Sequence, residues 1–191
     1  METGMHWVDA PVSGCPPAVR RGTLAVMAGG SAEDFARVSP LIAQYAGRVT
    51  YMGAVGAGQA TKLVNQALVG AGFMLLAEAI NFARRAGIDV EKVPAAIQGG
   101  RADSALLQEY WPSMLADGSA VGGRIDIILK DLDMVASVAE QAGAAMPLTR
   151  LAGELHRLLT AWGLGNRDNA AVASLYESAG GGPGAGTGLT S

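Results

Sequence analysis

The sequence predicts a mainly α-helical protein that begins with a small α/β remnant, and two observations support this fold class. Short apolar runs bounded by Gly and Pro, which are typical of strands, occur before residue 57. After that residue, apolar positions recur at helical spacing and the stretches end at Gly, a common helix stop. We therefore expect the C-terminal part of an α/β domain over residues 1–56, an all-α domain over 57–178 and a disordered Gly-rich tail over 179–191.

Three strands and one helix are expected in the first part. The strands are the apolar runs over residues 7–12, 23–28 and 49–52. Between the second and third, Ser31 is a suitable N-cap for a helix that reaches Tyr45 and stops before Gly47. Three strands and one helix are too few to form a well-covered sheet alone, so we interpret this fragment as the end of a larger α/β layer.

Five helical stretches and one short final helix are expected in the second part, where no convincing strand is found. Each is bounded by Gly, by Pro or by a residue that caps helices. The predicted helices cover residues 59–85, a segment from after Asp89 to Gly99, residues 104–115 with a break at Pro112, residues 125–141, residues 147–162, and residues 170–177 behind a cap at Asp168 or Asn169.

Composition and charge narrow the function classes. The 191 residues carry 14 Lys and Arg against 17 Asp and Glu, without a basic block, which argues against nucleic-acid binding. Two His and the single Cys15 form no metal site at a recognised spacing and no intramolecular disulfide, so we expect metal-free chemistry. The start does not resemble a signal peptide, and polar residues within 63–83 argue against a membrane span. A reducing, cytoplasmic location is therefore expected.

A lysine and an asparagine share one face of the most apolar predicted helix. Lys62 and Asn65 are three residues apart, so their side chains lie one above the other. Desolvation can lower the pKa of a lysine by up to about 3–5 units, which makes it a proton donor or acceptor near neutral pH. The alternative is a structural lysine whose ammonium group reaches solvent from a core helix. The helix alone does not decide between these interpretations.

The Gly56-x-Gly58 pair follows a strand and precedes a helix, as a dinucleotide-binding turn does, but the rest of that pattern is missing. Thr61 stands where a third small residue belongs. Glu78 lies inside a continuous predicted helix, not at the end of a second strand. The sequence therefore predicts no cradle for a pyrophosphate here.

Several spaced motifs together resemble the β-hydroxyacid dehydrogenases, which include 3-hydroxyisobutyrate dehydrogenase and tartronate-semialdehyde reductase. They are Asp9-Ala10-Pro11-Val12-Ser13-Gly14, Gly22-Thr23-Leu24, Met27-Ala28-Gly29-Gly30, Gly56-x-Gly58-x-x-x-Lys62-x-x-Asn65 and Lys130-Asp131-Leu132. The resemblance spans about residues 7 to 178 and implies a helical domain like that of 6-phosphogluconate dehydrogenase. Members of this family begin with a Gly-rich nucleotide-binding Rossmann half, so the resemblance implies that residues 1–56 end a Rossmann-type domain and that this is a truncated or split member.

The resemblance also implies roles for individual residues. Lys62 would be the catalytic acid or base, and Asn65 would hold the substrate by hydrogen bonds. Ser13 and Gly14 would bind the substrate carboxylate through a hydroxyl and backbone N–H groups, although an isolated serine at that place is also an ordinary turn residue. Lys130 would lie near the cofactor, NAD or NADP; by residue type alone it fits a solvated helix face equally well.

The implied activity is the NAD(P)-dependent oxidation of a small β-hydroxy acid to its semialdehyde, or the reverse. The implied partners are a small carboxylate substrate and a second copy of the chain in a homo-oligomer such as a dimer. The missing Rossmann half is either a separately encoded partner or sequence that has been lost. The alternative hypothesis is a non-catalytic oligomerisation or carboxylate-binding module. Residues 15–19 differ from the Gly-containing loop of the family, and Cys15 tolerates positive φ poorly, so the effect of this loop on activity stays open.

Overall fold

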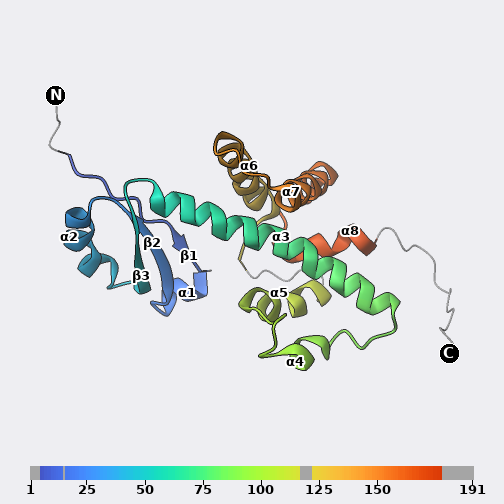
Figure 1. The fold of residues 1–191 in the computed structure, drawn as a ribbon. Helices are drawn as coiled ribbons and strands as arrows, with labels where there is room; N and C mark the ends of the chain where they lie inside the picture. The colour runs from blue at the N-terminus through green and yellow to red at the C-terminus, as the bar shows by residue number, and fades with distance from the viewer. Residues whose placement is uncertain (1–4, 15, 117–121, 178–191) are drawn as a thin grey trace.

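The computed structural model describes residues 5–14, 16–116 and 122–177 (Figure 1). It is mainly helical, with a small sheet in its N-terminal part, as the sequence predicts. Cys15 and the predicted tail over 179–191 lie outside the described residues. The 29-residue helix α3 (Ala57–Arg85) starts beside the sheet and continues through the helical part, so that it connects the two (Figure 1).

The sheet has the order β1 (Val12–Ser13), β2 (Leu24–Gly29) and β3 (Ala46–Gly53). β1 pairs antiparallel with β2, and β2 pairs parallel with β3 through the crossover helix α2 (Ala32–Ile42). The short helix α1 (Pro16–Arg20) separates β1 from β2.

The first strand is shorter than predicted. Within residues 7–12 only Val12 belongs to β1, while Asp9 makes a single bridge with Gly29. Pro11 lies between them and contributes only its carbonyl, which accepts the N–H of Met27 at 3.0 Å. Because proline has no N–H to donate, the ladder is interrupted at this residue.

Side chains cap the helix ends at Ser31, Ser104 and Asp168; the caps at Ser31 and Asp168 were predicted, whereas Ser104 was expected inside its helix. The Ser31 hydroxyl accepts the N–H of Asp34 at 3.0 Å at the start of α2, and the Ser104 hydroxyl accepts the N–H of Leu107 at 3.1 Å at the start of α5 (Ala105–Leu115). Asp168 accepts the N–H of Ala170 at 2.9 Å and so caps the final helical segment. That segment is a 3₁₀ turn over Asn169–Ala173 followed by α8 (Ser174–Glu177).

Two helix predictions are corrected. The helix expected after Asp89 is only α4 (Val93–Ile97), because Pro94 suits the first turn of a helix and sets a later start. Pro112 does not break α5, which continues to Leu115. Trp111 and Met114, at most 3% exposed, pack this last turn into the core and offset the backbone hydrogen bond that proline removes.

The remaining helices are α6 (Ile125–Gln141) and α7 (Pro147–Leu159), followed by a π-helical turn over Thr160–Leu164. The bounds of α6 agree with the prediction. α7 ends three residues earlier than predicted. The turn that follows it contains Gly163 at φ +83°, a backbone conformation that favours glycine and does not continue a helix.

The main core lies between α3 and the helices around it (Figure 1). Phe73 of α3 meets Tyr110 of α5 edge to face, with ring centroids 4.6 Å apart. Gly70 allows α6 to approach α3 closely, because a Cβ at that position would lie 2.8 Å from the side chain of Leu132. By length and hydropathy α3 resembles a membrane span, but it packs against β2, α5, α6 and α7, as a core helix does.

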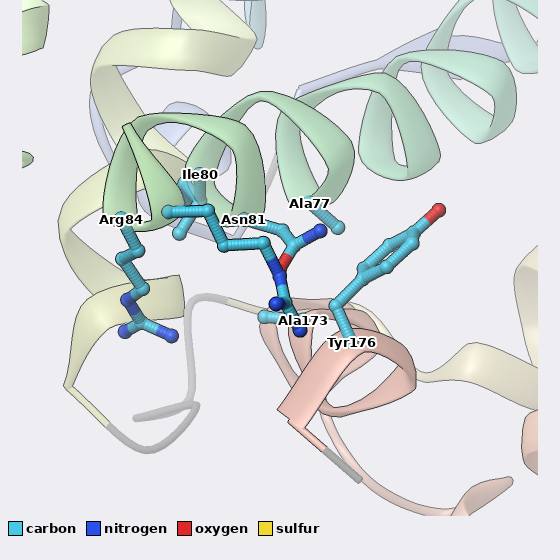
Figure 2. A pocket seen from close by; sticks show the side chains of 7 residues that line it. Ala77, Ile80, Asn81, Arg84, Ala173 and Tyr176 are labelled. Atoms are coloured by element: carbon cyan, nitrogen blue, oxygen red, sulfur yellow. The ribbon is translucent and has the colours of Figure 1, made fainter. Parts of the chain in front are cut away.

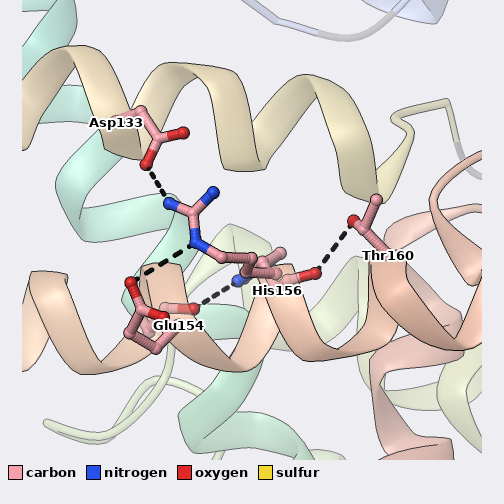
Figure 3. A network of polar contacts seen from close by, with 6 residues as sticks. Asp133, Glu154, His156 and Thr160 are labelled. Atoms are coloured by element: carbon pink, nitrogen blue, oxygen red, sulfur yellow. Dashed lines mark hydrogen bonds and ion pairs between the residues drawn. The ribbon is translucent and has the colours of Figure 1, made fainter.

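Polar contacts join α6 and α7 above a buried histidine (Figure 3). Arg157 donates to Asp133 at 2.6 Å and to Glu154 at 3.4 Å. His156 is fully buried, and its Nδ1 lies 2.8 Å from the carbonyl oxygen of Ala152, while its Nε2 has no hydrogen-bond partner in the described part of the chain. Burial lowers the pKa of His156 below 6.5, and the contact with Ala152 opposes this effect only in part.

Candidate active site

A carboxylate holds the N-terminus of α3. Asp9 accepts the backbone N–H of Gly56 at 2.6 Å and that of Gln59 at 2.8 Å. Asp9 is only 9% exposed, and burial by itself raises its pKa, but the hydrogen bonds from Gly56, Gln59 and neighbouring N–H groups outweigh burial and bring the pKa below 3.8. Asp9 is therefore an anion at the helix end that attracts negative charge.

The glycine at position 58 is required by this contact between helix and sheet. A Cβ on Gly58 would collide with the carbonyl oxygen of Met27 and lie 2.7 Å from the carboxylate of Asp9. Because Asp9 already occupies the N-terminus of α3, a phosphate there would meet a carboxylate. The structure thus supports the prediction that the Gly56-x-Gly58 pair is not a pyrophosphate cradle.

A chain of polar contacts connects β1, α3 and α6. The Ser13 hydroxyl donates to the side-chain oxygen of Asn65 at 3.1 Å, and the Asn65 amide donates to the side-chain oxygen of Gln66 at 2.9 Å. The Gln66 amide donates in turn to Asp131 at 2.5 Å, and the ammonium group of Lys130 lies 3.2 Å from the other oxygen of Asp131. The fold therefore brings together three of the predicted site residues that are far apart in the sequence.

The two remaining predicted residues, Lys62 and Gly14, are close in sequence to Asn65 and Ser13, which belong to these polar contacts. Lys62 is on α3, one turn before Asn65, and both are half-buried. Gly14 directly follows β1 with φ +133°, and a Cβ there would lie 2.9 Å from the side chains of Ala18 and Leu24. The turn after Ser13 thus requires a glycine, whatever the loop binds.

Exposure changes along the chain of contacts. Gln66 is 9% exposed, the side chain of Asp131 is 17% exposed and that of Lys130 is 62% exposed. The site is therefore closed around Gln66 and open at Lys130. Sequence reasoning missed Gln66 and Asp9 as site residues, although Asp9 opens the first quoted motif and Gln66 directly follows the motif that ends at Asn65.

Two hollows in the described surface lie elsewhere. One of about 260 Å³ lies between the end of α3 and α8, and Figure 2 shows the side chains that line it. They are Ala77, Ile80, Asn81, Arg84, Arg85, Ala173 and Tyr176. The second, of about 400 Å³, adjoins Arg124 and Asp168. Neither includes Lys62 or Asn65, and no group of His, Cys, Asp and Glu suited to a metal ion is found in the residues that the structure describes.

Comparisons with known proteins identify the family to which this chain belongs. Residues 56–176 match the family profile described as NAD-binding of NADP-dependent 3-hydroxyisobutyrate dehydrogenase, and residues 1–53 match that of the NAD binding domain of 6-phosphogluconate dehydrogenase. These profiles define a class of oxidoreductases that use NAD or NADP, the expected cofactors. The chain belongs to the β-hydroxyacid dehydrogenase family.

Individual relatives agree with this family. The 2-hydroxy-3-oxopropionate reductase of Escherichia coli is 34% identical over 176 residues, which are 92% of this chain and 60% of the relative. The 2-(hydroxymethyl)glutarate dehydrogenase of Eubacterium barkeri is 30% identical over 92% of this chain and 59% of its own length. A crystal structure of 3-hydroxyisobutyrate dehydrogenase from Salmonella typhimurium has a TM-score of 0.81 at 29% identity and is matched over 89% of this chain and 60% of that one. The chain thus spans about 60% of the length of these relatives.

Proposed function

We propose that this chain supplies the substrate-binding and proton-transferring residues of an NAD(P)-dependent hydroxyacid dehydrogenase, which interconverts a small β-hydroxy acid and its semialdehyde. The observation that carries the proposal is the contact chain from Ser13 through Asn65 to Lys130, beside the half-buried Lys62. The names of the relatives support a small anionic substrate, since 2-hydroxy-3-oxopropionate and 2-(hydroxymethyl)glutarate are both hydroxy acids.

We assign Lys130 to the cofactor side of the site, which would take NAD or NADP. Its side chain is 62% exposed, and its ammonium group lies 3.2 Å from Asp131, so a cation stands at the open end of the contact chain. The cofactor, when bound, supplies the group that accepts or returns the hydride. We assign no phosphate contact to α3, because Asp9 occupies its N-terminus.

In the proposed reaction the residues of this chain bind, orient and move one proton. Asn65 and the backbone beside Gly14 hold the substrate through its carboxylate oxygens, and Ser13 orients Asn65. In the oxidative direction, the neutral amine of Lys62 would take the proton of the substrate hydroxyl. In the reductive direction, the Lys62 ammonium returns the proton to the carbonyl oxygen.

The test is NAD(P)-linked turnover of a panel of small β-hydroxy acids by this chain, joined to the Gly-rich nucleotide-binding part of a relative. We expect Lys62→Ala to lower kcat by about 10²–10⁴, the usual contribution of a general acid or base. Lys92→Ala is the matched control, because Lys92 is an exposed lysine whose ammonium group pairs with Asp89. Equal turnover by the Lys62→Ala protein would contradict the assignment. A folded protein that turns over none of the acids would favour a non-catalytic carboxylate-binding module.

We further propose that the chain forms a homo-oligomer through the outer face of α3. Val64, Leu68, Leu75 and Phe82 are 62%, 71%, 66% and 67% exposed, and their spacings of four and seven residues place them in one stripe. Such a contiguous apolar stripe supports contact with another protein surface. Sedimentation of the wild-type chain should give a multiple of the mass of one chain, and Leu75→Lys should shift it towards one. A wild-type chain that sediments as a single copy would contradict this proposal.

A further inference from the structure

We infer that Gln66 is a positioning residue that transmits the polarity of Asp131 to Asn65 and Ser13, and so determines which hydrogen-bonding groups the site offers to a substrate. The catalytic consequence rests on the proposed function. The orientation itself rests only on the contacts between these four side chains.

The direction of the contact chain follows from the carboxylate at its end. A carboxylate accepts hydrogen bonds and donates none, so Gln66 turns its NH₂ group to Asp131 and its oxygen to Asn65. Asn65 then turns its own NH₂ group to Gln66, which leaves its oxygen for the hydroxyl proton of Ser13. Reversing one amide would bring two donors or two acceptors into contact.

Burial makes this direction matter. Gln66 is 9% exposed and the side chain of Asp131 is 17% exposed, so little water is available to replace a lost hydrogen bond. In so poorly solvated a place each hydrogen bond is stronger than in water and an unpaired polar atom is costly. The orientation of Asn65 is therefore held by Gln66 more firmly than an exposed asparagine would be.

Asp131 also connects the two sides of the site. One of its oxygens accepts from Gln66 and the other lies 3.2 Å from the ammonium group of Lys130. The same carboxylate thus orients the amides on the substrate side and the cation on the proposed cofactor side. Gln66 links Asp131 to Asn65 through one hydrogen bond to each.

The orientation assigns distinct tasks to Ser13 and Asn65. The Asn65 NH₂ group has two protons, and Gln66 takes one, so the second can donate to a substrate carboxylate oxygen. The Ser13 proton is committed to Asn65, so the Ser13 oxygen offers only lone pairs and its task is to hold the Asn65 oxygen. Gln66 itself touches neither substrate nor cofactor in this scheme.

The experiment follows the Asn65 side-chain NH₂ signals by NMR in the full ¹⁵N-labelled chain, with Asn65→Ala to assign them, while 3-hydroxyisobutyrate is titrated as the probe. Gln66→Leu keeps a similar volume without hydrogen bonds. Gln66→Glu keeps the direction only while the new carboxyl is protonated, since it then donates to Asp131. Gln141→Leu, at an exposed position at the end of α6, is the control.

We expect Gln66→Leu to shift the Asn65 signals and to weaken binding of the probe at least tenfold. In Gln66→Glu the Asn65 signals should resemble the wild type at low pH and change as the new carboxyl ionises, at a pH above its ordinary value of about 4.3 because Asp131 lies beside it. The same transition should weaken binding of the probe. A residue that only filled space would not produce this ionisation-linked change.

Asn65 signals that stay unchanged in Gln66→Leu, or that do not titrate in Gln66→Glu, would overturn the inference. If the signals respond as expected while the wild-type chain does not bind 3-hydroxyisobutyrate, the orienting role of Gln66 is supported and 3-hydroxyisobutyrate is rejected as a ligand of the site. The two proposals can therefore fail separately.

Discussion

Replacing Asp9 with asparagine tests how the sheet holds the N-terminus of α3. The Asp9 carboxylate accepts two backbone N–H groups, from Gly56 and Gln59. An asparagine side chain has one oxygen, so it keeps one of these bonds and turns its NH₂ group towards the other donor. The variant loses one charge-assisted bond, worth about 1.5–3 kcal/mol, and the attraction between the carboxylate and the helix end, worth about 0.3–1 kcal/mol. We expect the free energy of unfolding to fall by about 2–4 kcal/mol.

The difference between the two proteins should depend on pH. The folded-state pKa of Asp9 lies below the ordinary value of 3.8, so its stabilisation is complete above that pH and is lost as the pH falls through the folded-state value. The free energy of unfolding of the wild type should therefore exceed that of Asp9→Asn by a constant amount from about pH 7 to about pH 5. The difference should shrink as the pH approaches about 3.

Urea unfolding, followed by far-UV circular dichroism and by the fluorescence of buried Trp111, measures both effects. Glu109→Gln is the matched control, because Glu109 is exposed on α5 and its substitution should change stability by less than about 0.5 kcal/mol. An Asp9→Asn protein as stable as this control would refute the reasoning. So would a difference from the wild type that is the same at low and neutral pH.

Two further substitutions test packing and protonation. Gly58→Ala should lower the free energy of unfolding, measured by urea titration, by about 1–3 kcal/mol, because the new Cβ would collide with the backbone of Met27. Gly72→Ala is the control and should lower this free energy less, because its Cβ meets only the end of the Leu106 side chain. His156→Leu should remove an acid-sensitive part of the stability: burial lowers the pKa of His156 below 6.5, so the unfolded chain takes up the proton first as the pH falls. Below pH 6.5 the free energy of unfolding of the wild type should then fall by up to about 1.4 kcal/mol per pH unit relative to His156→Leu. Parallel plots of this free energy against pH for the two proteins, between about pH 7 and about pH 5, would argue against this explanation.

Much of the secondary structure was predictable because its causes are local. Ser31, Ser104 and Asp168 cap helices through N–H groups two or three residues away, so the capping pattern is visible in the sequence. The shortened first strand depends on the pairing partner of each residue around Pro11, and the helix that continues past Pro112 depends on core packing. Neither partner nor packing can be read from the local pattern. The domain boundary at residues 56 and 57 stays a prediction.

The candidate site was predictable to the extent that its residues share one helix face. Lys62 and Asn65 follow from a spacing of three residues. The contact of Asn65 with Ser13 crosses 52 positions, and that of Gln66 with Asp131 crosses 65, so both depend on how β1, α3 and α6 pack. A glutamine beside an apolar helix face carries no signal of its own without knowledge of its acceptor.

The sequence by itself determined the mainly helical class, the Lys62 and Asn65 pair and the family to which the motifs belong, because helical periodicity, capping and motif spacing can be read along the chain without knowledge of tertiary contacts. The tertiary structure decided that Asp9 neutralises the start of α3 and that Gln66 joins Asn65 to Asp131. These contacts form between residues from separate elements, and the position and direction of a hydrogen bond are set only when both partners have been placed.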